Sequence, residues 1–329
     1  MNKKCKEEVA TVGLPNYEGY KRIPFTSPRM NYCTFGGLPV GKVIEFYGEE
    51  HGGKTTTTLD IIANYQNMDE RKVLYVDAEN TLDADWATKL GVNVDDLIIL
   101  HPTSQGAEDI FQFICDSVET GEIGLWVIDS LGVLLSQDEI DKDMDEATYA
   151  GISKSLTRFS KKVEMLNAKH KCTGIGINQL RDDLKSTWGG TKTTGGKCWK
   201  HVCSVRMEFS KGKYIDESGK ILNNSTESPY GNEVMMLMKK NKTCPPTRRT
   251  GQYTLTYEYG IDYLTDLIDV AIRYDIVKQS GAWFSIVDTE TGEIIKDKIH
   301  GQSNVNKLLD EDEELLKLVE AQVDSQIGM

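Results

Sequence analysis

The stretch that decides the fold is Val43-Ile44-Glu45-Phe46-Tyr47-Gly48-Glu49-Glu50-His51-Gly52-Gly53-Lys54-Thr55. Its first five residues are mostly apolar and predict a buried strand, and its last eight match the pattern G-x-x-x-x-G-K-[ST]. Residues 54–68 follow, with Leu59, Ile62 and Ala63 at helical spacing. A strand, a glycine-rich turn and a helix in this order predict a phosphate-binding loop, because loop N–H groups and a helix N-terminus attract anions.

The residue types of this loop suit a nucleotide with a metal ion. We expect Lys54 to neutralise the β- and γ-phosphates and Thr55 to give its hydroxyl to Mg²⁺. Gly52 and Gly53 allow the backbone to approach phosphate oxygens closely. The residues expected to bind ATP are Gly48, Glu49, Glu50, His51, Gly52, Gly53, Lys54, Thr55 and Thr56.

Further apolar runs lie on the C-terminal side of the loop, at residues 71–77, 97–100, 124–129 and 174–179. Helical patterns alternate with them. Near-continuous apolar strands that alternate with helices predict an α/β fold with a mainly parallel sheet covered on both faces. Two of the helical patterns cover residues 107–119 and 147–167. Residues 203–260 instead show hairpin signals, and residues from about 262 look like a small separate unit.

Polar residues at the ends of these runs are the candidates for chemistry. Asp129 follows Leu-Trp-Val-Ile and is expected to hold the metal, although a helix N-cap is its alternative role. Hydrolysis also needs a group that orients water, and Glu79 lies at the carboxyl edge where open α/β sheets bind ligands. Asp77 is the rival and is more often structural. Gln179 could sense the γ-phosphate, or it could be a satisfied polar strand end.

Length and composition set outer limits. The chain has 329 residues, 39% of them hydrophobic and 27% charged, and a net charge of −13. These values are typical of a folded soluble protein and exclude a membrane bundle, a collagen-like chain and disorder throughout. Seven scattered cysteines without a CxxC pair make a structural zinc site unlikely and favour a reducing cytoplasm. The acidic total argues weakly against a nucleic-acid coat protein.

The sequence resembles the RecA family of strand-exchange recombinases. The resemblance rests on several segments in family order, from about Gly36 to about Leu309. It implies a RecA-like P-loop ATPase core at residues 36–261, an N-terminal oligomerisation segment at 1–35 and a small α/β C-terminal domain with an acidic tail at 262–329. The short N-terminus leads us to expect a phage-type member. The matching segments are the phosphate loop, Val76-Asp-Ala-Glu-Asn-Thr-Leu-Asp83, Lys89-Leu-Gly-Val92, Ile177-Asn-Gln-Leu-Arg181, Thr193-Thr-Gly-Gly196 and Gly281-Ala-Trp-Phe-Ser285.

The resemblance also assigns roles outside the loop. Glu79 matches the catalytic glutamate, and Gln179 matches the residue that couples the γ-phosphate to a DNA-binding loop. Asp83 and Trp86 match positions that contact adenine. Lys240 and Lys242 match lysines that reach the ATP of the neighbouring subunit, although by themselves they look like a solvated strand edge.

The candidate DNA-binding surface is a basic segment from Arg181 to Arg206 that resembles the second DNA loop of the family. It holds six lysines or arginines, at positions 181, 185, 192, 197, 200 and 206, and Trp188 as a stacking platform or wedge. Lys154, Arg158, Lys161 and Lys162 share one helix face and extend it, unless they form an ordinary solvated face. The residues expected to bind DNA are Arg181, Lys185, Trp188, Thr193, Thr194, Gly195, Gly196, Lys197 and Lys162.

These observations predict a cytoplasmic, DNA-dependent ATPase of recombination and repair. It would form helical filaments on single-stranded DNA with ATP and Mg²⁺, pair homologous double-stranded DNA, exchange strands, and release the filament on hydrolysis. One alternative is a hexameric helicase or packaging motor on the same core. A second is a nucleotide-gated regulatory binder that exchanges no strands.

Overall fold

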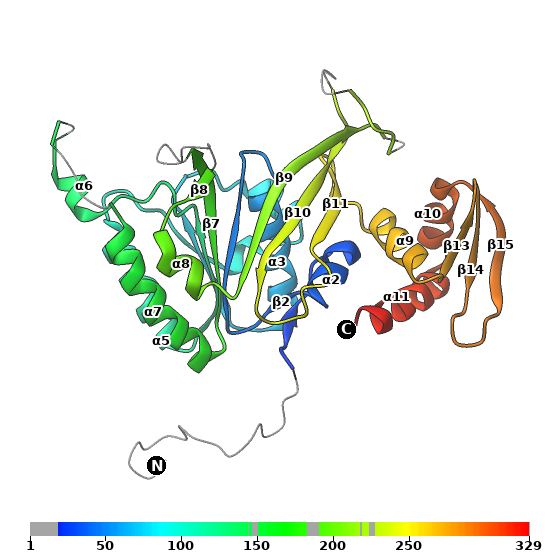
Figure 1. Ribbon diagram of the computed structural model, residues 1–329, viewed down its shortest axis with the longest axis horizontal. Coiled ribbons are helices and arrows are strands. Elements are labelled where there is room, and N and C mark those ends of the chain that lie inside the picture. Colours follow the sequence, from blue (N-terminus) through cyan, green and yellow to red (C-terminus); the bar gives the residue numbers. More distant parts are fainter. Residues whose placement is uncertain are drawn as a thin grey trace, which may run out of the picture.

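The computed structural model describes residues 19–143, 145–146, 151–182, 191–217, 219–223 and 228–328. A large sheet with helices on both faces forms the main body, and a three-stranded sheet with helices forms a smaller C-terminal unit (Figure 1). A two-stranded ribbon of β1 (Arg22–Ile23) and β2 (Leu38–Pro39) precedes the large sheet. Residues 1–18 of the predicted N-terminal oligomerisation segment lie outside the described residues.

The large sheet has the strand order β12-β11-β10-β9-β3-β7-β6-β4-β5, and β8 pairs with β7 beside this path. The six strands from β9 to β5 run parallel, whereas β9 to β12 form an antiparallel meander. The predicted mainly parallel α/β fold is therefore confirmed. The strands are β3 (Val43–Gly48), β4 (Lys72–Asp77), β5 (Leu97–Leu100), β6 (Ile123–Asp129), β7 (Thr173–Asp182), β8 (Thr191–Thr193), β9 (Val205–Ile215), β10 (Gly231–Asn241), β11 (Thr250–Thr256) and β12 (Gly260–Ile261).

Side chains of each parallel strand alternate between two apolar cores, one on each face of the sheet. Ile44 and Phe46 pack on the face covered by α3, whereas Trp126 and Ile128 pack on the face covered by α5, α7 and α8. Burial on both faces explains why these strands read as continuous apolar runs. The helices of the main body are α2 (Pro28–Thr34), α3 (Lys54–Met68), α4 (Ala84–Lys89), α5 (Ala107–Glu119), α6 (Gln137–Asp141), α7 (Ser153–His170) and α8 (Gly196–Val202), with a 3-10 turn η1 (Val94–Asp96).

The helix predicted over residues 147–167 begins at Ser153 in the structure and runs to His170, where Lys171 ends it in the left-handed conformation. Residues 147–150 lie outside the described part. The fifth strand was predicted to end at Gln179, but β7 continues to Asp182 because β8 pairs with its end. Arg181 therefore belongs to a strand rather than to a loop.

The C-terminal unit has its own apolar core, to which α9 contributes Leu267, Ile268 and Ala271. The acidic run Asp310–Glu314, predicted as part of an acidic tail, instead joins two packed helices. Asp312 accepts a hydrogen bond from the Leu315 N–H, and Leu315 is buried. The division into residues 1–35, 36–261 and 262–329 stays a prediction. The elements are α9 (Tyr263–Arg273), β13 (Val277–Ser280), β14 (Trp283–Val287), β15 (Ile294–His300), α10 (Gln302–Glu311) and α11 (Glu313–Ile327).

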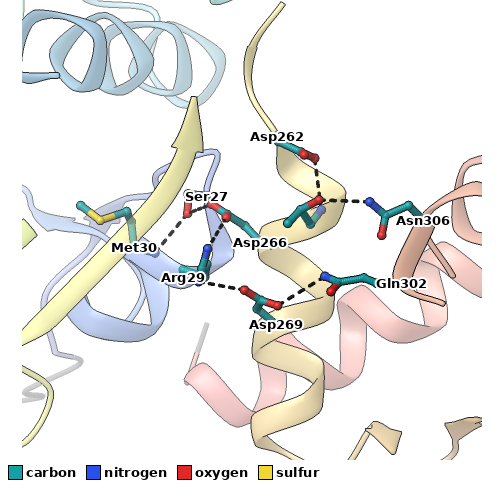
Figure 2. Close-up of polar contacts among 9 residues, drawn as sticks. Ser27, Arg29, Met30, Asp262, Asp266, Asp269, Gln302 and Asn306 are labelled. Atoms are coloured by element: carbon teal, nitrogen blue, oxygen red, sulfur yellow. Dashed lines mark hydrogen bonds and ion pairs between the residues drawn. The ribbon is translucent and has the colours of Figure 1, made fainter. Parts of the chain in front are cut away.

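A polar junction joins the C-terminal unit to α2 of the main body (Figure 2). Ser27 caps α2 and donates its hydroxyl proton to the fully buried Asp266 of α9. Arg29 reaches both Asp266, at 3.2 Å from Nη1 to Oδ1, and Asp269, at 2.8 Å from Nη2 to Oδ2. Gln302 of α10 donates to Asp269 at 3.4 Å. The buried carboxylate of Asp266 therefore lies between the main body and the C-terminal unit.

Candidate nucleotide and DNA site

The predicted phosphate loop lies between β3 and α3, at the carboxyl end of the central strands. Its first glycine is required by close packing, because a Cβ on Gly48 would lie 1.9 Å from the carbonyl oxygen of Phe209 on β9. Gly53 caps α3 with φ +87°, in the left-handed region that favours glycine. The loop glycines are therefore needed for packing against β9 and for the backbone conformation of the loop, in addition to any contact with phosphate.

Lys54 lies over the loop that precedes it. Its Nζ donates to the carbonyl oxygens of Gly48, at 3.2 Å, and Glu49, at 2.6 Å. Burial lowers the pKa of Lys54, while the carboxylates of Asp129 and Glu79 oppose that shift. A partly desolvated ammonium at a helix N-terminus is a suitable partner for an anion.

Thr55 and Asp129 meet at the end of β6. The Thr55 hydroxyl and the Tyr75 hydroxyl both donate to Oδ2 of Asp129, at 2.8 and 2.9 Å. Burial raises the pKa of Asp129, and these two hydrogen bonds oppose that shift. The alternative role of Asp129 as a helix N-cap is wrong, because a turn follows it and the next helix begins at Gln137.

Glu79 and Gln179 face each other although 100 positions separate them in the chain. Gln179 Nε2 donates to Glu79 Oε1 at 3.0 Å, and the Ser130 hydroxyl donates to the same oxygen at 2.5 Å. Asp77, the rival of Glu79, accepts the backbone N–H groups of Thr81 and Leu82 at 3.1 Å and so shapes the turn after β4. Asp77 therefore has a structural role, as its position in the strand predicts.

A pocket of about 430 Å³ opens beside the loop, lined by His51, Trp86, Lys211, Asn232 and Tyr257 among others. Asp83 does not line it; its carboxylate caps α4 through the N–H groups of residues 85 and 86. Sequence reasoning missed Lys211, Asn232 and Tyr257, which come from β9 to β11 and the turn after them. No local motif marks these three residues, since only strand pairing brings them to the loop.

The second half of the predicted DNA segment is described, whereas Lys185 and Trp188 lie outside the described residues. Arg181 donates to the carbonyl oxygen of Gly132 at 2.5 Å. Thr193 ends β8, and the Thr194 carbonyl oxygen accepts from Asn178 at 2.9 Å. Gly195 caps α8 with φ +100°, followed by Gly196 with φ +65° and by Lys197, which is exposed.

Two groups of predicted basic residues lie on regular elements rather than on a loop. Arg206, counted in the basic stretch, is not on a loop: it pairs with the fully buried Glu45 inside the sheet. Lys162 donates to Gln112 at 3.4 Å across a groove of about 710 Å³ between α5 and α7, which Lys154 and Arg158 also line. Three of the four basic residues predicted for one helix face thus line one groove.

Lys240 and Lys242 lie at the end of the sheet opposite the phosphate loop. Lys240 is in register with Arg206, three residues before Phe209, which is in register with Gly48. Its Nζ donates to the carbonyl oxygens of Lys200 and His201, and Lys242 Nζ also donates to His201. Neither lysine therefore reaches the nucleotide loop of its own chain.

A phosphate loop between a central strand and a helix, with an acidic residue at the end of β6, defines a P-loop nucleotide-binding protein. Comparison with known proteins is more specific. The RecA N-terminal domain model matches residues 6–262, and the RecA C-terminal domain model matches residues 265–328. The chain therefore belongs to the RecA family.

Similar proteins include several bacterial proteins named RecA. The chain is 34% identical over 290 residues to Protein RecA of Clostridioides difficile, a match that covers 88% of this chain and 78% of that protein. It is 35% identical over 289 residues to Protein RecA of Chlorobaculum tepidum, with the same shares covered. Protein RecA of Fusobacterium nucleatum subsp. nucleatum is 35% identical over 272 residues, covering 82% of this chain and 68% of that protein.

These matches confirm the prediction of a nucleotide-binding DNA recombinase and DNA-dependent ATPase of recombination and repair, and they do not favour the helicase or motor alternative. The phage-type origin stays a prediction. Within the described part of the chain, no helix combines the length and the apolar character needed to cross a bilayer.

Proposed function

We propose that this chain binds ATP and Mg²⁺ between subunits of a helical filament on single-stranded DNA, and pairs that strand with homologous duplex DNA. The hydrogen bond from Gln179 to Glu79 carries the proposal. It links Glu79, at the end of β4, to Gln179 on β7, the strand that leads into the DNA segment. A nucleotide that alters this hydrogen bond would therefore alter the affinity of the DNA segment for single-stranded DNA.

The donor set at Thr55 and Asp129 fits a magnesium ion. A hydroxyl and a carboxylate oxygen lie 2.8 Å apart, and Mg²⁺ prefers such hard oxygen ligands. Burial disfavours the charged form of Asp129, so a cation beside it would offset that penalty. When bound, Mg²⁺ would neutralise charge on the phosphate oxygens.

The neighbouring residues would hold the rest of the nucleotide. Lys54 would leave its two loop carbonyls for the β- and γ-phosphates, while residues 48–53 and Thr56 would surround the phosphate groups. Trp86 lines the pocket and would stack on the base. Asp83 would orient Trp86 through the helix that it caps.

We propose Glu79 as the group that orients the attacking water. Both hydrogen bonds that it accepts within the described part of the chain use Oε1, so Oε2 can accept a proton from water. Gln179 would turn its amide toward a γ-phosphate and release Oε1. ATP and ADP would then favour two different positions of β7, which is a two-state switch.

The surface that would hold single-stranded DNA follows β7. Arg181, Lys197 and the backbone of residues 193–196 supply cations and N–H groups that suit phosphate contacts without reading sequence. Lys185 and Trp188, between them in the chain, are proposed to add a further cation and a stacking ring. Lys162 would extend this surface along α7.

Lys240 and Lys242 are proposed to act across the subunit junction. Their carbonyl partners belong to α8, within the predicted DNA segment, so nucleotide contact from a neighbour would compete with those bonds. We further propose a cytoplasmic location, because the six described cysteines are all free thiols, which persist in reducing compartments.

Strand exchange with ATP tests this function. Lys54→Ala should bind no ATP and exchange no strands, because the loop loses its cation. Glu79→Gln should bind ATP and single-stranded DNA as the wild type does, yet hydrolyse ATP about 100-fold more slowly or worse, as expected for a lost general base. Glu122→Gln, which alters an exposed carboxylate remote from the loop, is the matched control.

Two results would contradict the proposal. Normal turnover in Glu79→Gln would remove that residue from the hydrolysis step. Equal coating of single-stranded DNA by the wild type without nucleotide, with ADP and with ATP would remove the coupling between the two sites.

A further inference from the structure

Asn178 and Gln179 are neighbours on β7 and face opposite sides of the sheet, because strand side chains alternate. Gln179 is in register with Gly48 of the phosphate loop, and its amide reaches Glu79. Asn178 is in register with Tyr47 and points to the side that carries α8 and the end of the DNA segment. One peptide unit thus joins a side chain at the nucleotide to a side chain at the DNA segment.

The Asn178 amide is fully buried and all its polar atoms are hydrogen-bonded. Its Nδ2 donates to Glu45 Oε1 at 3.0 Å and to the Thr194 carbonyl oxygen at 2.9 Å. Its Oδ1 accepts the backbone N–H of Gln179 at 3.1 Å. Since both partners of Nδ2 are acceptors, only this orientation of the amide satisfies the site.

Glu45 on β3 fixes the orientation of the Asn178 amide by accepting a hydrogen bond from Nδ2. It is fully buried, and its other oxygen, Oε2, is held by Arg206 Nε at 2.5 Å. The guanidinium of Arg206 also lies 4.8 Å from the ring centroid of Tyr47. A buried carboxylate is costly unless it is paired and hydrogen-bonded, and the pair with Arg206 leaves Oε1 for Asn178. Glu45, held by Arg206, is therefore the fixed partner of Asn178 within the sheet. Thr194, which follows β8, is its second partner.

We propose that Asn178 is the positioning residue that transfers the state of Gln179 to the DNA segment, by holding Thr194 against the sheet. This inference rests on the proposed function, in which Gln179 responds to the γ-phosphate. A change at Gln179 moves the peptide that it shares with Asn178, and Nδ2 passes that movement to the Thr194 carbonyl. Thr194 directly follows β8, and Gly195 caps α8 in the left-handed conformation, so a shift at Thr194 would move β8 relative to α8.

The test measures the ratio of single-stranded DNA affinities with a non-hydrolysable ATP analogue and with ADP. Asn178→Asp keeps the size of the side chain but replaces the donor of Thr194 and Glu45 by an acceptor. We expect its nucleotide affinity without DNA to stay within about twofold of wild type, while the affinity ratio falls at least about tenfold, within the usual range of coupling between sites.

Two further variants separate positioning from stability. The double variant Glu45→Gln/Asn178→Asp restores a donor and an acceptor between positions 45 and 178, yet leaves the Thr194 carbonyl without its donor. We expect it to fold and still to lack the coupling. The control is Asn167→Asp, a buried asparagine on α7 whose Oδ1 accepts from Trp126 Nε1 at 3.1 Å, and which should keep the wild-type ratio.

The outcomes distinguish this inference from the proposed function. A large ratio in the wild type and an equal ratio in both Asn178 variants would overturn the role of Asn178 alone. A ratio of one in the wild type would overturn the proposed function and the inference with it. A loss of ratio in Asn167→Asp equal to that in Asn178→Asp would assign the effect to general loosening of the core and so also overturn the inference.

Discussion

The junction between α2 and α9 predicts a pH-dependent stability that one substitution should remove. Burial raises the pKa of Asp266 from 3.8 to about 7, and the Asp269 charge adds to this shift, while Arg29 and the Ser27 hydroxyl oppose it. Asp266→Asn keeps the shape of the side chain and is neutral at every pH. Its oxygen can accept from Arg29, its amide can donate to the Ser27 hydroxyl, and Arg29 keeps Asp269 as a partner (Figure 2).

The sign follows from the direction of the shift. A raised pKa means that the folded state binds the proton more tightly than the unfolded state, so this contribution to stability is complete below about pH 4 and is lost as pH rises to about 7. Each pKa unit corresponds to about 1.4 kcal/mol. Between about pH 5 and pH 8 the wild type should therefore lose about 3 kcal/mol that Asp266→Asn does not lose.

Urea unfolding of the full-length wild type and variant at both pH values measures this difference. Groups common to the two proteins cancel, so the variant should gain about 3 kcal/mol relative to the wild type on going to the higher pH. Glu122→Gln controls for the loss of one acidic group at the surface. Hydrogen exchange of the α9 amides should show that protection falls from about pH 5 to pH 8 more in the wild type than in Asp266→Asn. An unfolding difference that is equal at both pH values would refute the reasoning.

Three further predictions concern the nucleotide site. Gly48→Ala should lower the free energy of unfolding by about 3 kcal/mol or more and prevent nucleotide binding, because the new Cβ would lie 1.9 Å from the carbonyl oxygen of Phe209; urea unfolding and nucleotide titration measure both. Trp86→Ala should weaken ATP binding about tenfold, the lower end of the stacking energies seen for bases, with turnover at saturation unchanged, and equal affinity would exclude stacking. Lys240→Met and Lys242→Met should keep the nucleotide affinity measured without DNA yet lose DNA-stimulated hydrolysis; normal stimulation in both would place them outside the subunit junction.

Much of the candidate site can be predicted from the sequence, because local chemistry marks it. The helix after the phosphate loop has the predicted bounds, Lys54 and Met68, since a left-handed Gly53 begins it and an extended Asp69 ends it. Asp129 follows an apolar strand and lies beside Thr55, as the pattern of the loop and β6 predicts. The bounds of the helix are set by neighbours within a few residues, whereas the contact between Thr55 and Asp129 joins residues 74 positions apart that two motifs of the sequence mark separately.

Two predictions are wrong because distant segments of the chain meet. Arg206 looks like part of a basic loop, yet strand pairing places it against Glu45 inside the sheet. The acidic run looks like a tail, yet Leu315 packs into the core of the C-terminal unit and draws that run into a helix boundary. In both cases an apolar or charged partner far along the chain overrides the local composition.

The amino-acid sequence alone determined the phosphate loop, the buried parallel strands and the family, because glycine conformation, apolar runs and motif order are properties of short segments. Only the tertiary structure decided that Gln179 meets Glu79, that Asn178 holds Thr194 beside Glu45, and that Asp266 is buried at the junction with α2. These contacts depend on the order of strands in the sheet and on the packing of separate units. Both are determined by burial of side chains from the whole chain, which no short segment reveals.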